Sequence, residues 1–107
     1  LLRPNSRGSV SLASPRHEDA PLVDFRYYED PDDLAAHVAG VKRVAAFFQT
    51  PTFRGRIKAD LMTAHCRSDA DWAEVIRNHV GTNYHPVGTC RMGTGSDAVV
   101  DPRLRVH

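Results

Sequence analysis

Residues 81–93, GTNYHPVGTCRMG, combine the side chains of this sequence that are best suited to chemistry. His85 stands before Pro86, and the residue before a proline is driven out of the helical region into extended geometry. Pro86 donates no backbone hydrogen bond, so strand pairing should be interrupted just after the histidine. Gly88 has no Cβ and lets another backbone or a flat ligand come close. We therefore expect a stiffly held imidazole at the end of a strand, with open space beside it.

The same segment also has ordinary structural explanations. An imidazole changes charge near neutral pH, but His85 taken alone is more often a hydrogen-bonded structural residue. Cys90 is better explained as a small buried hydrophobic residue than as a nucleophile, because no suitably spaced base is evident nearby. Arg91 is expected to pair with Asp97 or Asp101. Residue types alone therefore predict a small α+β domain with one pre-organised histidine.

The six histidines and two cysteines of the chain do not form a recognisable metal-binding pattern. The closest trio is His79, His85 and Cys90, and its spacings of six and five residues match no zinc site. No GxGxxG sequence is present, so the chain carries no dinucleotide-binding fingerprint of its own. We therefore expect no metal site.

The size and charge of the chain narrow the classes of partner. Its 107 residues fit one domain, and 14 Lys and Arg against 13 Asp and Glu give no reason to expect nucleic acid or an anionic membrane. Two cysteines do not make a disulfide scaffold, and no apolar run approaches the ~20 residues that cross a bilayer. We expect a reducing, cytoplasmic setting. The first residue is Leu1 rather than Met, which suggests a piece of a longer protein.

Two helices are predicted in the elements that surround the histidine segment. The first runs from Pro31 to Phe48, with Asp30 as its N-cap and proline at its first position. Its apolar stripe consists of Leu34, Val38, Val41, Ala45 and Phe48. The second runs from Asp69 to Val80, where Ser68 is the N-cap and acidic residues occupy the first turn.

Strands are predicted from alternating apolar residues and from proline positions. One covers Ser9 to Ala13, and another immediately precedes Pro86. Residues 57–62 form a possible short strand, and residues 98–106 form a last strand that Pro102 interrupts. These strands should form a largely antiparallel sheet with the helices packed on one face, which is an α+β fold.

Two longer stretches carry a family resemblance. YHPVGTCRMG at residues 84–93, followed by AVVDPRLRVH at residues 98–107, closely resembles the C-terminal signature of the glucose-methanol-choline (GMC) oxidoreductases. LLRPNSRGSVSLAS at residues 1–14 resembles the opening strand of that family's substrate-binding domain. PLVDFRYYEDPDDLAAHVAGVKRV at residues 21–44 resembles its proline-rich connection and the following helix. The resemblance covers nearly the whole chain.

The resemblance implies that residues 1–107 are a truncated C-terminal, substrate-binding domain from a choline dehydrogenase-like, FAD-dependent enzyme that oxidises the CH-OH group of alcohols. In that family the residue matching His85 lies beside FAD and acts as a general acid or base. Tyr84 is then expected to contact the alcohol, although it could simply pack with its hydroxyl satisfied.

The resemblance also implies what these residues do not include. The family's FAD-binding domain, and the segment with a second catalytic His or Asn, are absent from residues 1–107. The expected partners are therefore an alcohol and the missing FAD-binding domain. The chain alone is expected neither to bind FAD nor to be active. The alternative is a flavin-free binding or interaction module that keeps the fold.

Overall fold

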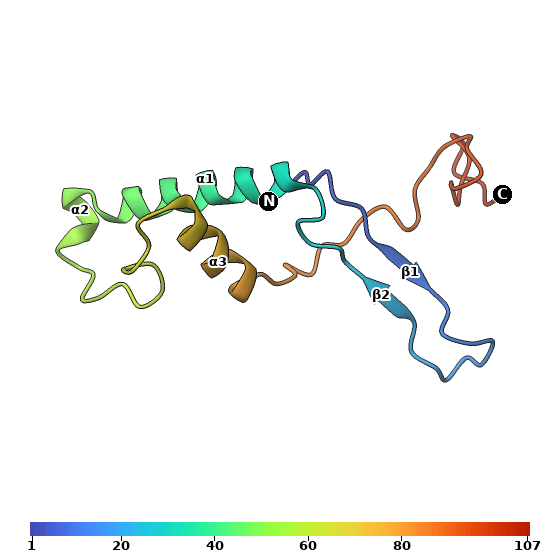
Figure 1. Ribbon diagram of the computed structural model, residues 1–107. Coiled ribbons are helices and arrows are strands. Elements are labelled where there is room, and N and C mark those ends of the chain that lie inside the picture. The colour runs from blue at the N-terminus through green and yellow to red at the C-terminus, as the bar shows by residue number, and fades with distance from the viewer. The chain divides into compact units, whose positions relative to one another are not determined.

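The computed structural model describes all 107 residues, which divide into two compact units. Unit 1 comprises Leu1–Arg7 and Arg26–Val80, and unit 2 comprises Gly8–Phe25 and Gly81–His107. The three helices belong to unit 1 and the two strands belong to unit 2 (Figure 1). None of the helices has the length and apolar character needed to cross a membrane.

Helix α1, Pro31–Phe48, has the predicted boundaries. The Asp30 side chain accepts a hydrogen bond from the backbone N–H of Asp32 at 2.9 Å, which satisfies one of the unpaired N–H groups of the first turn. Proline at the first position loses no hydrogen bond there, because its missing N–H would have been unpaired in any case. Val38, in the predicted apolar stripe, is buried.

The chain before α1 is attached to the first turn of that helix by a buried carboxylate. Asp33 accepts hydrogen bonds from the backbone N–H groups of Asn5 and Ser6, at 2.7 and 2.8 Å, and from the Ser6 hydroxyl at 2.5 Å. These bonds hold the pKa of Asp33 below its ordinary value, and the largest contribution comes from the Ser6 hydroxyl. Residues more than 25 positions apart are thus joined by one side chain.

Helix α3, Asp69–His79, confirms the second predicted helix. Ser68 and Asp71 form a reciprocal capping box, in which each side chain accepts a hydrogen bond from the other residue's backbone N–H. Val75 and Ile76 are buried, and α3 packs against α1. Lys42 on α1 also forms an ion pair with Asp69, at 2.5 Å. Apolar burial and a cross-helix ion pair together join the two helices.

The segment between α1 and α3 differs from the prediction. Helix α2, Pro51–Arg54, is a single turn, and residues 57–62 form no strand. The reason is local: the Asp60 carboxylate accepts hydrogen bonds from the backbone N–H groups of Met62 and Thr63, at 3.0 and 2.7 Å. A side chain that takes these N–H groups curls the backbone into a turn and removes the donors that a strand would use.

The sheet of unit 2 is an antiparallel pair, β1 at Ser9–Ser11 and β2 at Leu22–Asp24. Gly8 stands just before β1 because a Cβ at that position would collide with the carbonyl oxygen of Asp24. The side chains of both strands are exposed, including that of Val10.

The α+β class and the antiparallel sheet are confirmed, but the sheet has only two strands. The strands predicted before Pro86 and at residues 98–106 are wrong, because those segments form turns and isolated bridges. The bridges pair Val100 with Met92 and with Val106. The helices belong to unit 1 and the sheet to unit 2, so the predicted packing of the helices on one face of the sheet stays a prediction.

Candidate functional site

The histidine segment lies on the surface of unit 2. Residues 81–92 are all exposed, and His85 follows a bend rather than a strand. The Thr82 hydroxyl accepts a hydrogen bond from the backbone N–H of Tyr84 at 3.0 Å, and Tyr84 has a left-handed backbone with φ of 60°. The bend explains why no strand forms here, since the turn uses the N–H that sheet pairing would need.

Gly88, which was expected to let another backbone or a flat ligand come close, has an open backbone position. Its φ is 106°, a conformation that L side chains rarely adopt, and a Cβ placed there would meet nothing within 4 Å. The imidazole of His85 makes no hydrogen bond to any other residue of the chain. Within these residues, His85 is therefore free to interact with a ligand or with another part of a longer protein.

The turn after Gly88 is held by Arg91. Its guanidinium forms an ion pair with the Asp97 carboxylate, and its Nε donates to the Asp97 carbonyl oxygen at 3.2 Å, which confirms one of the two predicted partners. The Arg91 carbonyl oxygen accepts from the backbone N–H of Val99 at 2.9 Å. The backbone N–H of Gly93 donates to the Val100 carbonyl oxygen, also at 2.9 Å. These bonds fix the Cys-Arg-Met-Gly turn on the segment that follows it.

Asp101, the other predicted partner of Arg91, organises the end of the chain instead. Its carboxylate binds the Arg105 side chain at 2.6 and 2.8 Å and accepts from the backbone N–H groups of Arg103 and Arg105. The Arg105 guanidinium is the largest cause of a lowered pKa at Asp101. His107 reaches back to the Gly93 carbonyl oxygen at 3.2 Å. Residues 91–107 therefore form one hydrogen-bonded block.

The two cysteines are placed differently from each other. Cys90 is exposed, so the prediction that it is buried is wrong; it lies in the surface turn that Arg91 fixes. Cys66 is buried, and desolvation is the largest cause of its raised thiol pKa, followed by the charge of Asp71. Burial and the raised pKa of Cys66 both disfavour the thiolate, which is the reactive form of a cysteine. No group of three or more His, Cys, Asp or Glu side chains is arranged to hold a metal ion.

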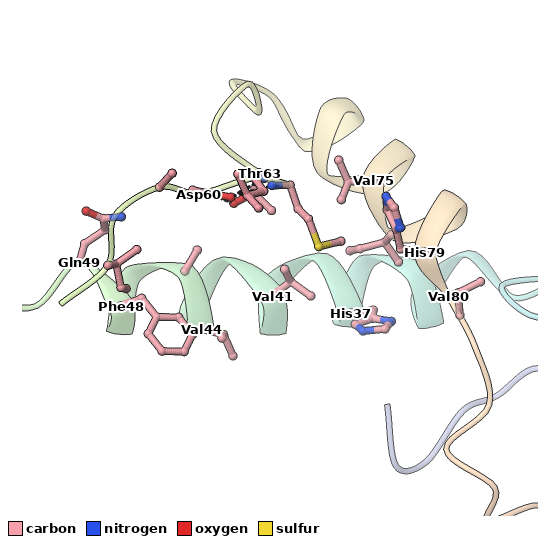
Figure 2. Close-up of a pocket in the computed structure, with 16 residues that line it drawn as sticks. His37, Val41, Val44, Phe48, Gln49, Asp60, Thr63, Val75, His79 and Val80 are labelled. Atoms are coloured by element: carbon pink, nitrogen blue, oxygen red, sulfur yellow. Dashed lines mark hydrogen bonds between the residues drawn. The ribbon is translucent and has the colours of Figure 1, made fainter. Parts of the chain in front are cut away.

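A cavity of about 570 Å³ lies in unit 1 and was not predicted. Figure 2 shows its walls, which come from α1, from residues 57–63 and from α3. His37 lies near one end, where its Nδ1 is 2.6 Å from the Tyr28 hydroxyl. Burial lowers the pKa of His37 and is also the largest cause of the raised pKa of Tyr28.

The sequence contained a signal for this cavity. His37, Val41, Val44 and Phe48 follow helical spacing, so they share one face of α1 with part of the apolar stripe. A histidine on an apolar face indicates that the face borders a hollow or a polar partner. Neither Tyr84 nor His85 lines this cavity.

Comparison with known proteins gives a consistent set of relatives. The family described as GMC oxidoreductase matches residues 4–107. "Alcohol dehydrogenase [acceptor]" of Pseudomonas putida is 41% identical over 107 residues, which cover 99% of this chain and 19% of the relative. Choline oxidase of Arthrobacter globiformis is 37% identical over 106 residues, which cover 94% of this chain and 19% of that protein.

A solved structure agrees with these sequence relatives. The crystal structure of pyridoxine 4-oxidase from Mesorbium loti superposes with a TM-score of 0.88 at 32% identity. It covers 96% of this chain, and the match extends over 20% of the oxidase chain. The chain therefore spans about a fifth of the length of the relatives that it matches.

Proposed function

The chain belongs to the GMC oxidoreductase family as a C-terminal domain, and we propose that it serves the FAD-dependent oxidation of an alcohol with His85 as the acid-base group. The names of the relatives include an alcohol dehydrogenase and a choline oxidase, which supports an alcohol as the substrate class. In this proposal residues 1–107 contribute a wall of the substrate cavity, and an FAD-binding domain lies outside them.

One observation carries the role of His85. Its imidazole is exposed, makes no hydrogen bond within the chain and stands three residues before the open backbone at Gly88. A histidine with a structural role would normally have its ring nitrogens bonded to the protein. A free imidazole nitrogen can act as a general base and take the hydroxyl proton of an alcohol.

The residues of the segment fit one side of a flavin site. Gly88 leaves its backbone open to a flat ring, whereas no glycine-rich fingerprint for the pyrophosphate is present. When bound, FAD supplies the acceptor for the hydride that leaves the alcohol carbon. His85 accepts the hydroxyl proton at its ring nitrogen as the carbon–hydrogen bond breaks. The left-handed turn at Tyr84 positions the backbone from which the imidazole projects.

Tyr84 has a supporting role in this proposal. The residue is 84% exposed, so its ring offers apolar surface and a hydroxyl directly beside His85 in the chain. An aromatic face of this kind can cover the carbon skeleton of a substrate while the hydroxyl group stays with the histidine. Holding the alcohol in place supplies the entropic part of catalysis.

The test is the His85→Ala variant of the whole enzyme that contains this chain. Loss of a general base lowers the rate by about 10²- to 10⁴-fold, which corresponds to roughly 3 to 5 kcal/mol of barrier. One lost hydrogen bond to the alcohol would weaken substrate binding by only about 1 kcal/mol. The measurement is anaerobic flavin reduction by stopped flow, normalised to bound FAD and repeated across the pH range in which imidazole titrates.

The matched control is His17→Ala, because His17 is another exposed histidine of unit 2. That variant should reduce its flavin at the rate of the unmodified enzyme. An unchanged reduction rate in His85→Ala, accompanied by weaker flavin retention, would assign His85 a structural role. A whole protein that purifies without the yellow flavin absorbance would favour the binding-module alternative.

A further inference from the structure

The direction of His85 is constrained by the backbone on both of its sides. Pro86 follows it, and the residue before a proline is restricted to extended geometry. Tyr84 precedes it in the left-handed region, with φ of 60°. The ring of His85 makes no hydrogen bond within the chain, so the neighbouring backbone alone determines where the imidazole points.

The left-handed conformation of Tyr84 is unfavourable by itself. A bulky residue rarely adopts a positive φ, because its Cβ then comes close to the following carbonyl oxygen. Such a conformation persists only where other contacts maintain it. Tyr84 is exposed, so packing of its ring does not maintain the turn. The turn therefore depends on a hydrogen bond of the backbone.

The Thr82 side chain supplies that hydrogen bond. Its hydroxyl oxygen accepts from the backbone N–H of Tyr84, two residues further along the chain, at 3.0 Å. Among residues 82–90 this is the one hydrogen bond that the structure has. A threonine hydroxyl that bonds the N–H group two residues on closes a turn without any partner from elsewhere in the fold. Thr82 therefore maintains the turn from which His85 projects.

We propose that Thr82 is a positioning residue, whose hydroxyl holds the turn at Tyr84 and thereby aims the imidazole of His85 at the alcohol. This inference rests on the proposed role of His85 as the acid-base group. Thr82 itself touches neither the alcohol nor the flavin in this account. Because positioning acts on the reacting geometry, its loss should lower the rate of flavin reduction more than it weakens substrate binding.

The test compares two substitutions of Thr82 in the whole enzyme that contains this chain. Thr82→Val keeps the shape of the side chain and removes the acceptor, whereas Thr82→Ser keeps the hydroxyl. Thr94→Val is the matched control, because Thr94 is another exposed threonine of unit 2 and its side chain makes no hydrogen bond. Anaerobic flavin reduction is measured for each variant at several alcohol concentrations and normalised to bound FAD.

The expected effect of Thr82→Val is moderate, because one intramolecular hydrogen bond shifts the equilibrium of a turn by a factor of about 2 to 10. The limiting rate of flavin reduction should fall about 3- to 10-fold, while the alcohol concentration at half-saturation changes less than about 2-fold. Thr82→Ser and Thr94→Val should retain the rate of the unmodified enzyme. A normal rate in Thr82→Val, or no recovery in Thr82→Ser, would overturn the inference.

The double variant His85→Ala/Thr82→Val tests whether Thr82 acts through the imidazole. A residue that acts through His85 has no further effect once the imidazole is removed, so the double variant should reduce its flavin at the rate of His85→Ala alone. If valine slows His85→Ala as much as it slows the unmodified enzyme, Thr82 acts independently and the inference is wrong. A normal rate in His85→Ala alone would overturn the proposed function itself, and this inference with it, so the two failures are distinguishable.

Discussion

Unit 1 and unit 2 are stabilised by different kinds of contact. In unit 1, α1 and α3 have side-chain caps and pack together through buried residues that include Val38 and Ile76. In unit 2, the two-stranded sheet exposes all of its side chains, and residues 91–107 are held by hydrogen bonds and ion pairs of partly exposed groups. The apolar burial of the chain is therefore concentrated in unit 1.

This difference matters because the candidate acid-base residue belongs to the unit with less apolar burial. Residues 81–92 carry His85 and are all exposed. A catalytic group needs to be held close to its productive geometry. Local bonds such as those of Arg91 and Asp101 fix the backbone nearby, but a site on this segment needs a second wall from elsewhere. The comparison therefore supports the proposal that residues 81–92 form only one wall of the site.

The largest stability effect should come from the buried face of unit 1. Ile76 is 6% exposed, and Ile76→Ala should cost about 2–5 kcal/mol because it removes buried methyl groups and leaves a cavity. Val10 in β1 is 52% exposed, and Val10→Ala should cost no more than about 0.5 kcal/mol. Denaturant unfolding of the 107-residue chain, followed by far-UV circular dichroism, compares the two. Equal losses of unfolding free energy in the two variants would show that the Val10 side chain is buried in a core, which would contradict this comparison.

The same contrast explains what the sequence could predict. Both long helices have local signals, namely an N-cap, acidic residues in the first turn and an apolar face, so α1 and nearly all of α3 were found. The strands predicted before Pro86 and at residues 98–106 do not form, because single side chains decide the backbone conformation there. The Thr82 hydroxyl and the Asp101 carboxylate take the N–H groups that strands would use.

The candidate site was predictable only in part. The positions of His85, Gly88 and Arg91 could be interpreted residue by residue, and the Arg91 pairing with Asp97 is confirmed. The cavity in unit 1 had a sequence signal only on its α1 face, because its opposite wall depends on how residues 57–63 curl against the helices. That conformation follows from the turn at Asp60. The apolar residues around Asp60 predicted a strand instead of a turn.

Acid should affect the two units differently, although both contain a carboxylate with a lowered pKa. A depressed folded-state pKa contributes stability above the ordinary value of 3.8, and that stability is lost as pH falls through the folded pKa. Below about pH 4, protonation of Asp33 should release Asn5 and Ser6, which are more than 25 residues away in sequence. Protonation of Asp101 should change only contacts within four residues.

Amide signals followed by NMR during acidification measure this difference directly. The signals of Asn5 and Ser6 should shift together and lose protection, because their segment is no longer attached to α1. Asp33→Asn should remove that transition and leave the one at Arg103 and Arg105 in place. If acid leaves Asn5 and Ser6 unaffected while the helices unfold, the buried carboxylate does not attach the N-terminal segment as described.

The smallest effect should come from the ion pair of unit 2. The side chains of Arg91 and Asp97 are 52% and 68% exposed, and exposed pairs of this kind contribute only about 0–1 kcal/mol. Arg91→Gln should therefore leave the helical unfolding transition unchanged, while hydrogen exchange at Gly93 and Val99 becomes faster. Added salt screens exposed charges, so it should reduce the difference between the variant and the unmodified chain.

The control is Arg103→Gln, since no hydrogen bond uses the Arg103 side chain. A loss of helical stability in Arg91→Gln would mean that the turn contributes to the fold beyond unit 2, and the contrast between the two units would have to be abandoned.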